Sequence, residues 1–266
     1  MNPDSMNPDS MNQAIDLLCR HRSVRKFTDA PIADNLLHTI VRAAQCAATS
    51  HHVQAYTIIR VQDKNNRKKI ATLSGPQPWV EQAPVFLVFC ADLTRLDAAC
   101  ATHKSAPETG WAEQFVVATV DTALVAQNLM VAAESLGIGG VFIGGIRNDP
   151  KTVCDLLDIP DMAYPVFGMC LGYPDHTPDI KPRLPLELVL KEDSFFSVMG
   201  KQRPNNPEIP LENHLNVYDQ TCRDYYLNRD SNLRDQTWTR QMADFMGKVT
   251  RPHMKSFLEK QGFFLR

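Results

Sequence analysis

The chain has 266 residues, which is enough for one large domain or two small ones with a sizeable core. Lys and Arg total 28 and Asp and Glu total 30, so the formal net charge is -2. Nucleic-acid-binding domains usually carry a basic excess, and this near balance therefore argues against a nucleic-acid partner.

The first residues are a polar tandem repeat, "MNPDSMNPDSMN", which lacks the apolar segment of a signal peptide. We expect residues 1–12 to be disordered, as a duplicated start or an expression scar. The seven cysteines are odd in number, form no C-x-x-C pair and lie partly in apolar runs. They are interpreted as free, largely buried thiols of a cytoplasmic protein.

The histidines form no H-x-x-x-H pair, and only His51 and His52 are adjacent. Neighbouring residues on a helix or strand rarely point at one metal ion. No metal site is predicted.

Apolar spacing predicts two helices, over residues 13–20 and 32–49, followed by a strand over residues 55–63. A short charged helix is predicted over residues 65–73. The continuous apolar run "PVFLVFCAD", residues 84–92, is typical of a central strand covered on both faces.

Residues 93–112 carry charges and small side chains, and we expect a loop or lid there. The longest helical pattern follows, over residues 111–137, and Gly137 is a natural residue to end it. Its length would allow a membrane span, but the polar residues within it favour a buried central helix. No membrane partner is expected.

The second half predicts a strand over residues 139–146 and a helix over residues 148–159. Asn148 or Asp149 would cap this helix, with Pro150 at its first position. A buried strand over residues 164–173 and a proline-rich connection precede a charged helical C-terminal region. Because helices and strands mix without strict alternation, the fold class is predicted as α+β. We expect one domain over residues 13–266, with a C-terminal helical extension.

The glycines of "GIGGVFIGG", residues 137–145, follow a helix and flank a strand. A dinucleotide-binding glycine turn has the opposite order, so that assignment fails. Two interpretations stay open. The glycines either serve tight packing, or Gly144 and Gly145 let backbone N–H groups approach a flat or anionic ligand.

Two short basic segments suit a phosphate. "HRSVRKF" carries Arg22 and Arg25 with Ser23 between them, and "KPRLP" holds Lys181 and Arg183 two residues apart on a stiff segment. Solvated charges, or cations at a helix C-terminus, are the alternatives. Thr49 and Ser50 either terminate a helix or bind a ligand head group.

The ordered set of "HRSVRKFTDAPI", "TSHHVQ", "SGPQPWVEQAP", "ESLGIGGVFIGGIRN", "FGMCLGYPDHTPDIKPRLP" and "YYLNRDSNLRDQTW" closely resembles the oxygen-insensitive, NADPH-preferring nitroreductases of the nitroreductase A and flavin reductase P group. The resemblance runs from about residue 13 to the C-terminus. It implies an intertwined α+β homodimer with a central, mostly antiparallel sheet flanked by helices, which binds FMN at the dimer interface.

By the same resemblance, the arginines of "HRSVRKF" serve the flavin phosphate and pyrimidine edge, and Thr49 and Ser50 come from the partner subunit. Arg229, Arg234 and Arg251 are candidates for the NADPH phosphates. The implied cofactor-binding residues are His21, Arg22, Ser23, Arg25, Thr49, Ser50, Gln77, Phe142, Ile143, Gly144, Gly145, Lys181, Arg183, Arg229, Arg234 and Arg251.

The resemblance implies an enzyme that passes two electrons from NADPH through FMN to a nitroaromatic or quinone by a ping-pong hydride mechanism. The cofactor carries this chemistry, so no catalytic side chain is predicted. A flavin or chromate reductase of the same family, or a flavin-binding module without turnover, are the alternatives. His51 and His52 replace part of the family's serine-rich run, and Pro78 stands where relatives often carry lysine.

Overall fold

The computed structural model describes residues 12–195, 211–264 and 266. The prediction for residues 1–12 therefore lies, apart from Asn12, outside the described residues. The chain divides into two compact units. The helical unit comprises the described parts of Met1–Arg22 and Pro178–Thr250, and the sheet unit comprises those of Ser23–Thr177 and Arg251–Arg266.

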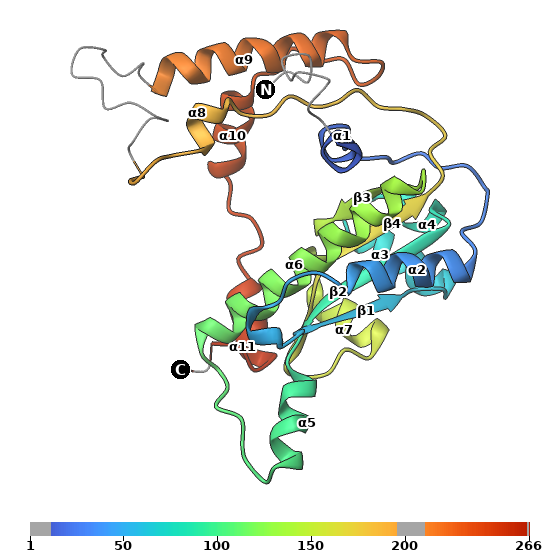
Figure 1. The fold of residues 1–266 in the computed structure, drawn as a ribbon, viewed down its shortest axis with the longest axis vertical. Helices are drawn as coiled ribbons and strands as arrows, with labels where there is room; N and C mark the ends of the chain where they lie inside the picture. The colour runs from blue at the N-terminus through green and yellow to red at the C-terminus, as the bar shows by residue number, and fades with distance from the viewer. Residues whose placement is uncertain (1–11, 196–210, 265) are drawn as a thin grey trace. The chain divides into compact units, whose positions relative to one another are not determined.

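The sheet unit contains one four-stranded sheet (Figure 1). Its strands are β1 (Tyr56–Arg60), β2 (Val85–Asp92), β3 (Gly139–Ile143) and β4 (Ala163–Gly172), in the order β1-β2-β4-β3. All three strand pairs are antiparallel. The predicted α+β class with a mostly antiparallel sheet is thus confirmed.

Strand β2 is buried along its whole length and separates two apolar clusters. Phe86, Val88 and Cys90 belong to one cluster, and the alternate residues Val85, Leu87 and Phe89 belong to the other. Side chains of a strand alternate between faces, so an apolar run with no polar gap must be covered twice. The prediction of a central, doubly covered strand is correct.

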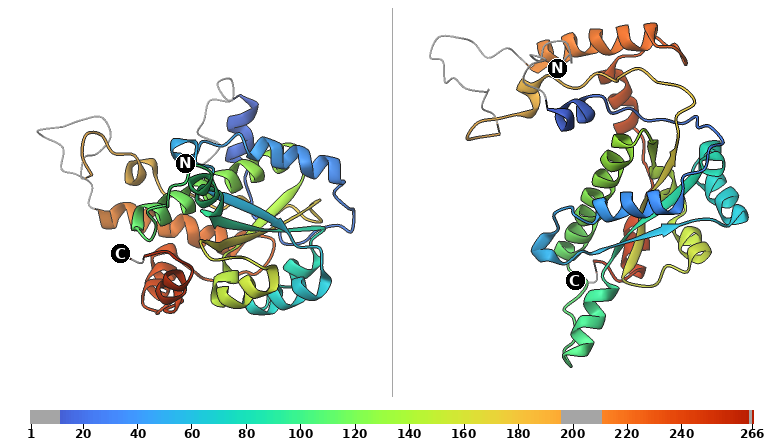
Figure 2. Two further views of the ribbon diagram at one scale, coloured as in Figure 1. Left: turned by 90° about the horizontal axis from the view of Figure 1, so that it is seen from below. Right: turned by 45° about the vertical axis from the view of Figure 1, so that its right-hand side comes forward.

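Helices cover both faces of the sheet, as Figure 2 shows. Helices α2 (Asp34–Ala44) and α6 (Ala112–Ser135) contribute to the cluster that contains Leu87. The cluster on the other face receives side chains from α3 (Lys64–Leu73), α4 (Pro78–Gln82), α7 (Pro150–Leu157) and α11 (Met254–Lys260).

Helix α6 packs against the sheet with one face only. Asp121, Val125 and Leu129 lie on this buried face, whereas Val116 and Val120 on the opposite side are each 49% exposed. Within the described residues, α6 is the helix with the length and composition of a membrane span. The predicted end of this helix is correct, because Gly137 follows the cap residue with φ 74°.

Several boundaries differ from the predictions; strand β1, for example, ends at Arg60 rather than at residue 63. Helix α2 ends at Ala44 rather than near residue 49, because hydrogen bonds from Cys46 N to Ala43 O and from Ala47 N to Ala44 O tighten the chain into a turn. Residues 93–112 include helix α5 (Thr94–Thr102) and are not wholly loop. Strand β3 ends at Ile143, and a 3₁₀ helix, η4 (Gly144–Asn148), follows it.

Asp149, and not Asn148, caps α7, because its carboxylate accepts the backbone N–H of Thr152 at 3.1 Å. Pro150 occupies the first position of this helix, as predicted. Asn148 is thereby left to make contacts beside the glycines of η4, which bear on the candidate site.

The helical unit contains α1 (Gln13–Cys19), α8 (Leu186–Val189), α9 (Leu211–Asn228) and α10 (Trp238–Met246). Helices α9 and α10 are joined by an edge-to-face contact between Tyr218 and Trp238, with ring centres 5.8 Å apart. The carboxylate of Asp219 also accepts the backbone N–H of Thr239 at 2.8 Å.

Candidate functional site

The predicted cofactor-binding residues divide between the two units, which are described in turn. The sheet unit contains Ser23, Arg25, Thr49, Ser50, Gln77, Phe142, Ile143, Gly144, Gly145 and Arg251. The helical unit contains His21, Arg22, Lys181, Arg183, Arg229 and Arg234.

The segment that follows Arg22 runs along the free edge of β3. Ser23 forms a parallel bridge with Gly140, and Val24 donates its N–H to Gly140 O at 2.9 Å. This backbone pairing fixes the position from which Arg25 extends. The Arg25 guanidinium carbon lies 5.8 Å from the centre of the Trp79 ring.

Trp79 connects Arg25 to Gln77. The indole N–H of Trp79 donates to Gln77 Oε1 at 3.1 Å, and Gln77 Nε2 donates to Ser74 O at 2.7 Å. Both ends of the Gln77 amide are thus held by neighbours, which defines its orientation. Arg25 and Gln77, which are about fifty residues apart in sequence, are brought together by one tryptophan.

Gly144 and Gly145 have different surroundings. A Cβ atom added to Gly145 would lie 2.1 Å from Ser74 O, a backbone atom that has no room to move. The atoms nearest a Cβ on Gly144 would be those at the end of the flexible Arg147 side chain, at 3.3 Å. Close packing against backbone therefore explains the glycine at 145, whereas the nearest neighbour of Gly144 is a side chain that can move.

The residues before the glycine pair differ in what they can offer a ligand. Ile143 is fully buried in the core, so only its backbone is available. Phe142 is partly exposed and packs edge-to-face on Phe167, with ring centres 5.2 Å apart. One further polar group lies here: the buried Ser74 hydroxyl has no hydrogen-bond partner in the described structure.

Arg251 returns to this region from the distant C-terminal part of the chain. Its Nε donates to Asn148 Oδ1 at 2.9 Å, and Asn148 Nδ2 donates to Leu73 O at 3.2 Å. Arg147, which the sequence reasoning missed, donates to Val166 O. Burial and the nearby charge of Arg251 lower the pKa of Arg147. Its place two residues after Gly145 in "GGIRN" was the available signal.

Thr49 and Ser50 lie in a loop with unusual backbone geometry. His51, His52 and Gln54 adopt φ values of 46°, 60° and 52°, a left-handed conformation that non-glycine residues rarely take. Both histidine side chains are exposed. No hydrogen bond or ring contact among the described residues links Thr49 or Ser50 to the group around Gln77.

Asp121 holds this loop in place from the buried face of α6. Its carboxylate accepts the N–H of Ser50 at 3.0 Å and the N–H of Ala55 at 3.2 Å. Asp121 is 1% exposed, so both oxygens act within the protein interior. The sequence reasoning noted this acidic residue only as an interruption of an apolar helix.

In the helical unit, Arg22 binds backbone carbonyls. Its Nη1 donates to Pro178 O at 3.1 Å and its Nε donates to Arg20 O at 3.2 Å. Arg183 similarly folds back on its own segment and donates to Lys181 O at 2.6 Å. The contact of Arg22 with Pro178 joins the "HRSVRKF" segment to the proline-rich connection.

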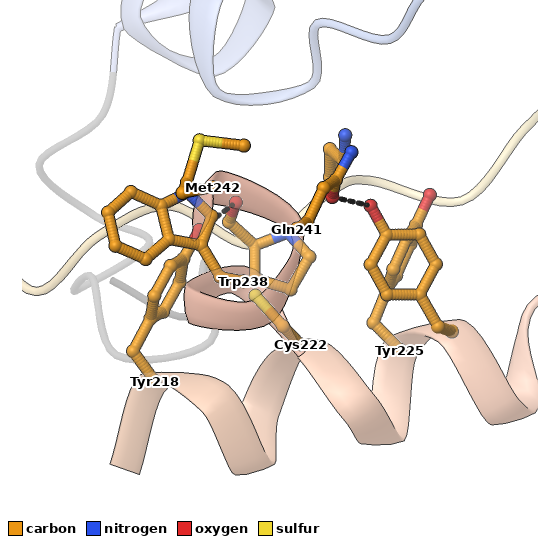
Figure 3. A pocket seen from close by; sticks show the side chains of 9 residues that line it. Tyr218, Cys222, Tyr225, Trp238, Gln241 and Met242 are labelled. Atoms are coloured by element: carbon orange, nitrogen blue, oxygen red, sulfur yellow. Dashed lines mark hydrogen bonds between the residues drawn. The ribbon is translucent and has the colours of Figure 1, made fainter. Parts of the chain in front are cut away.

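Lys181, Arg229 and Arg234 converge on the ring of Tyr226. The ring centre lies 5.9 Å from Lys181 Nζ, 4.8 Å from the Arg229 guanidinium carbon and 4.3 Å from that of Arg234. A pocket of about 150 Å³ borders this cluster (Figure 3). Its lining residues are Lys181, Pro182, Tyr218, Cys222, Tyr225, Tyr226, Trp238, Gln241 and Met242.

Comparison with known proteins identifies the family of this chain. The Nitroreductase family model matches residues 18–173, and the model of the family's C-terminal domain matches residues 181–266. An oxygen-insensitive NADPH nitroreductase of Salmonella typhimurium is 42% identical over 95% of this chain and 98% of that protein.

Solved structures of two proteins are similar to this chain along nearly its whole length. NfrA1 of B. megaterium has a TM-score of 0.87 and 41% identity over 95% of this chain and all of its own. An NADPH:FMN oxidoreductase from Vibrio harveyi, complexed with NAD+, has a TM-score of 0.82 and 36% identity over 96% of this chain and 100% of its own. On family models that together cover most of the chain, and on relatives aligned along nearly its whole length, this protein belongs to the nitroreductase family.

Proposed function

We propose that the protein is an FMN-dependent oxidoreductase that passes two electrons from NADPH to a nitroaromatic or quinone. The observation that carries this proposal is that a chain of the nitroreductase family places basic side chains and the glycine-flanked end of β3 at the positions predicted to bind the cofactor. Close relatives are named for NADPH and for FMN.

The residues present fit a flavin mononucleotide. The sheet unit offers the backbone of Gly144 beside the flexible end of Arg147, the oriented amide of Gln77 and the buried hydroxyl of Ser74, which has no partner among the described residues. The helical unit offers the guanidinium groups of Arg22 and Arg183 on a proline-stiffened segment. Cationic forks suit a phosphate, and glycine backbone suits close approach of a planar ring.

FMN, when bound, accepts a hydride from NADPH and supplies two electrons to the acceptor. Arg22 and Lys181 would hold its phosphate, while Arg25 and Arg183 would place positive charge at the pyrimidine edge, where it favours electron uptake. His21, Ser23, Phe142, Ile143 and Gly145 would complete the contacts. Two-electron delivery avoids a nitro radical that oxygen could re-oxidise.

Arg229, Arg234 and Arg251 are proposed for the NADPH phosphates. Thr49 and Ser50 are proposed to contact the flavin of a partner subunit, because the described contacts do not link them to the Gln77 group of their own chain. The functional unit would then be a homodimer, and the exposed apolar side of α6 supports this. We infer a cytoplasmic location from the absence of disulfides among the seven cysteines.

The absorbance spectrum of the purified protein, recorded without oxygen, tests the proposal. We expect a yellow protein whose flavin bands bleach on addition of NADPH and return on addition of a nitroaromatic or menadione. Initial rates at varied NADPH and acceptor should give the parallel double-reciprocal lines of a ping-pong mechanism. A colourless protein that FMN cannot reconstitute would contradict the proposal.

Free flavin is the second candidate acceptor, because one close structural relative is named an NADPH:FMN oxidoreductase. Comparing kcat/KM for FMN, chromate, a nitroaromatic and a quinone separates these acceptors. Bound flavin that NADPH does not bleach would indicate a flavin-binding module without turnover.

A further inference from the structure

Tyr226 is the aromatic centre of an unusual group of like charges. Three cations from three parts of the chain surround it: Lys181 from the proline-rich connection, Arg229 after α9 and Arg234 before α10. Each lies within about 6 Å of the ring centre, the range in which a cation is attracted to an aromatic face.

The cations of this cluster lack carboxylate partners in the part of the chain that the structure describes. Within the described residues, no ion pair involves Lys181, Arg229 or Arg234. Asp235, next to Arg234 in sequence, is engaged by both Nε and Nη2 of Arg223, and the Asp179 carboxylate accepts the backbone N–H of Asp230 at 3.2 Å. Gathering like charges is unfavourable, and contact with the face of the Tyr226 ring offsets part of that cost.

The ring itself is held firmly. Tyr226 is 2% exposed, and its hydroxyl donates to Gln241 Oε1 at 3.2 Å. Its backbone carbonyl accepts the N–H of Arg234 at 3.2 Å. The buried, hydrogen-bonded ring and the backbone carbonyl of Asn232, which accepts from Arg229 Nε at 3.2 Å, together define where the guanidinium groups lie.

We propose that Tyr226 is a positioning residue for NADPH, holding Arg229 and Arg234 in the arrangement that receives the 2′-phosphate. The inference rests on the proposed function and adds to it the residue that orders the phosphate-binding arginines. A 2′-phosphate carries close to two negative charges, which suits paired guanidinium groups whose own neutralisation is incomplete. NADH lacks this group and would gain little from the same arrangement.

The experiment compares Tyr226→Leu, which removes the ring, with Tyr226→Phe, which keeps the ring and removes only the hydroxyl. Steady-state kinetics with NADPH and NADH are measured on the FMN-loaded full chain. We expect Tyr226→Leu to reduce the ratio of kcat/KM for NADPH to that for NADH by on the order of tenfold, through KM. Tyr226→Phe should retain most of the wild-type ratio.

A second measurement does not depend on turnover. Adenosine 2′-phosphate is titrated into each variant, with adenosine 5′-phosphate as the matched probe. Tyr226→Leu should weaken binding of the 2′-phosphate and leave the 5′-phosphate unaffected.

An equal loss of kcat/KM for NADPH and NADH in Tyr226→Leu, or an unchanged ratio, would overturn the inference. A wild-type protein that oxidises neither nucleotide would instead refute the proposed function. In that case the titrations still decide whether Tyr226 orders a 2′-phosphate site, and equal affinity in the Leu and Phe variants would reject it.

Discussion

Arg25 illustrates how one side chain depends on a chain of neighbours. Its guanidinium lies over the Trp79 ring. The indole N–H of Trp79 donates a hydrogen bond to the side chain of Gln77, and the Gln77 amide donates one to the backbone carbonyl of Ser74. We expect Arg25→Ala to weaken FMN binding by about 1–3 kcal/mol, the contribution of a charge-assisted hydrogen bond. Fluorescence titration of the apoprotein with FMN measures this change.

Lys26→Ala is the matched control for Arg25→Ala, because Lys26 is the adjacent exposed cation and has no proposed contact. It should leave the FMN dissociation constant unchanged. Equal affinity of the Arg25→Ala and wild-type proteins would remove Arg25 from the proposed site.

Asp92, at the end of β2, links stability to pH. Burial alone would raise the pKa of this carboxyl, but hydrogen bonds from Thr57 and Thr94 and the charge of Arg95 outweigh it and hold the pKa below the ordinary 3.8. The folded state therefore binds this proton more weakly than the unfolded state does. The resulting stabilisation is present above about pH 4 and is lost as pH falls through the folded-state value.

We expect Asp92→Asn to lower the free energy of unfolding at pH 7 by about 1–3 kcal/mol, because charge-assisted hydrogen bonds are lost. The difference from wild type should shrink below about pH 4, where the wild-type carboxylate becomes protonated. Urea unfolding at several pH values measures both quantities. A difference that grows towards low pH would contradict this account.

At the scale of elements, Asp121 connects α6 to the loop that carries Thr49 and Ser50. The loop contains three non-glycine residues in the left-handed conformation, which costs energy that its surroundings must offset. Two backbone N–H groups donate to the buried Asp121 carboxylate and supply part of that offset. The loop geometry is thus imposed by a helix that follows it by about seventy residues.

Asp121→Asn keeps the side-chain shape but leaves one oxygen where two backbone donors need acceptors. We expect a loss of about 1–3 kcal/mol in unfolding free energy and faster amide hydrogen exchange at Ser50 and Ala55. Glu113→Gln, the same chemical change at an exposed position of α6, is the control. Unchanged exchange at both amides would show that the carboxylate does not hold the loop.

At the scale of the whole molecule, the exposed apolar side of α6 is a candidate interface for the proposed homodimer. Val116, Val120 and Leu124 follow one another at four-residue spacing and are 49%, 49% and 43% exposed. Residues at this spacing form one stripe on a helix, and an exposed apolar stripe is typical of an interface. The proposed homodimer would cover it.

We expect Val120→Lys to shift the protein from dimer to monomer, because a charge would be buried at the interface. Light scattering after size exclusion measures the mass of each species. Ala98→Lys adds the same charge to an exposed position of α5 and should leave the mass unchanged. A wild-type protein that is monomeric at micromolar concentration would reject the homodimer.

Elements with strong local patterns were predictable. Strand β2, the long helix α6 with Gly137 after its end, and the Pro150 start of α7 all follow from short-range periodicity and cap chemistry. The early end of α2 and the helix within residues 93–112 were missed. The apolar spacing in these two segments is too weak to define where a helix begins or ends. Contacts with distant segments decide those boundaries instead.

The candidate site shows the same division. The sequence by itself determined the family pattern, the basic segments and the glycine pair, because each is written in neighbouring residues. Only the tertiary structure decided that Gly145 packs on Ser74, that Asp121 holds the loop at Ser50, and that three cations share the ring of Tyr226. These contacts join residues that are far apart in sequence. Their geometry is set by how the helices and strands pack, and the spacing of residues along the chain does not predict that packing.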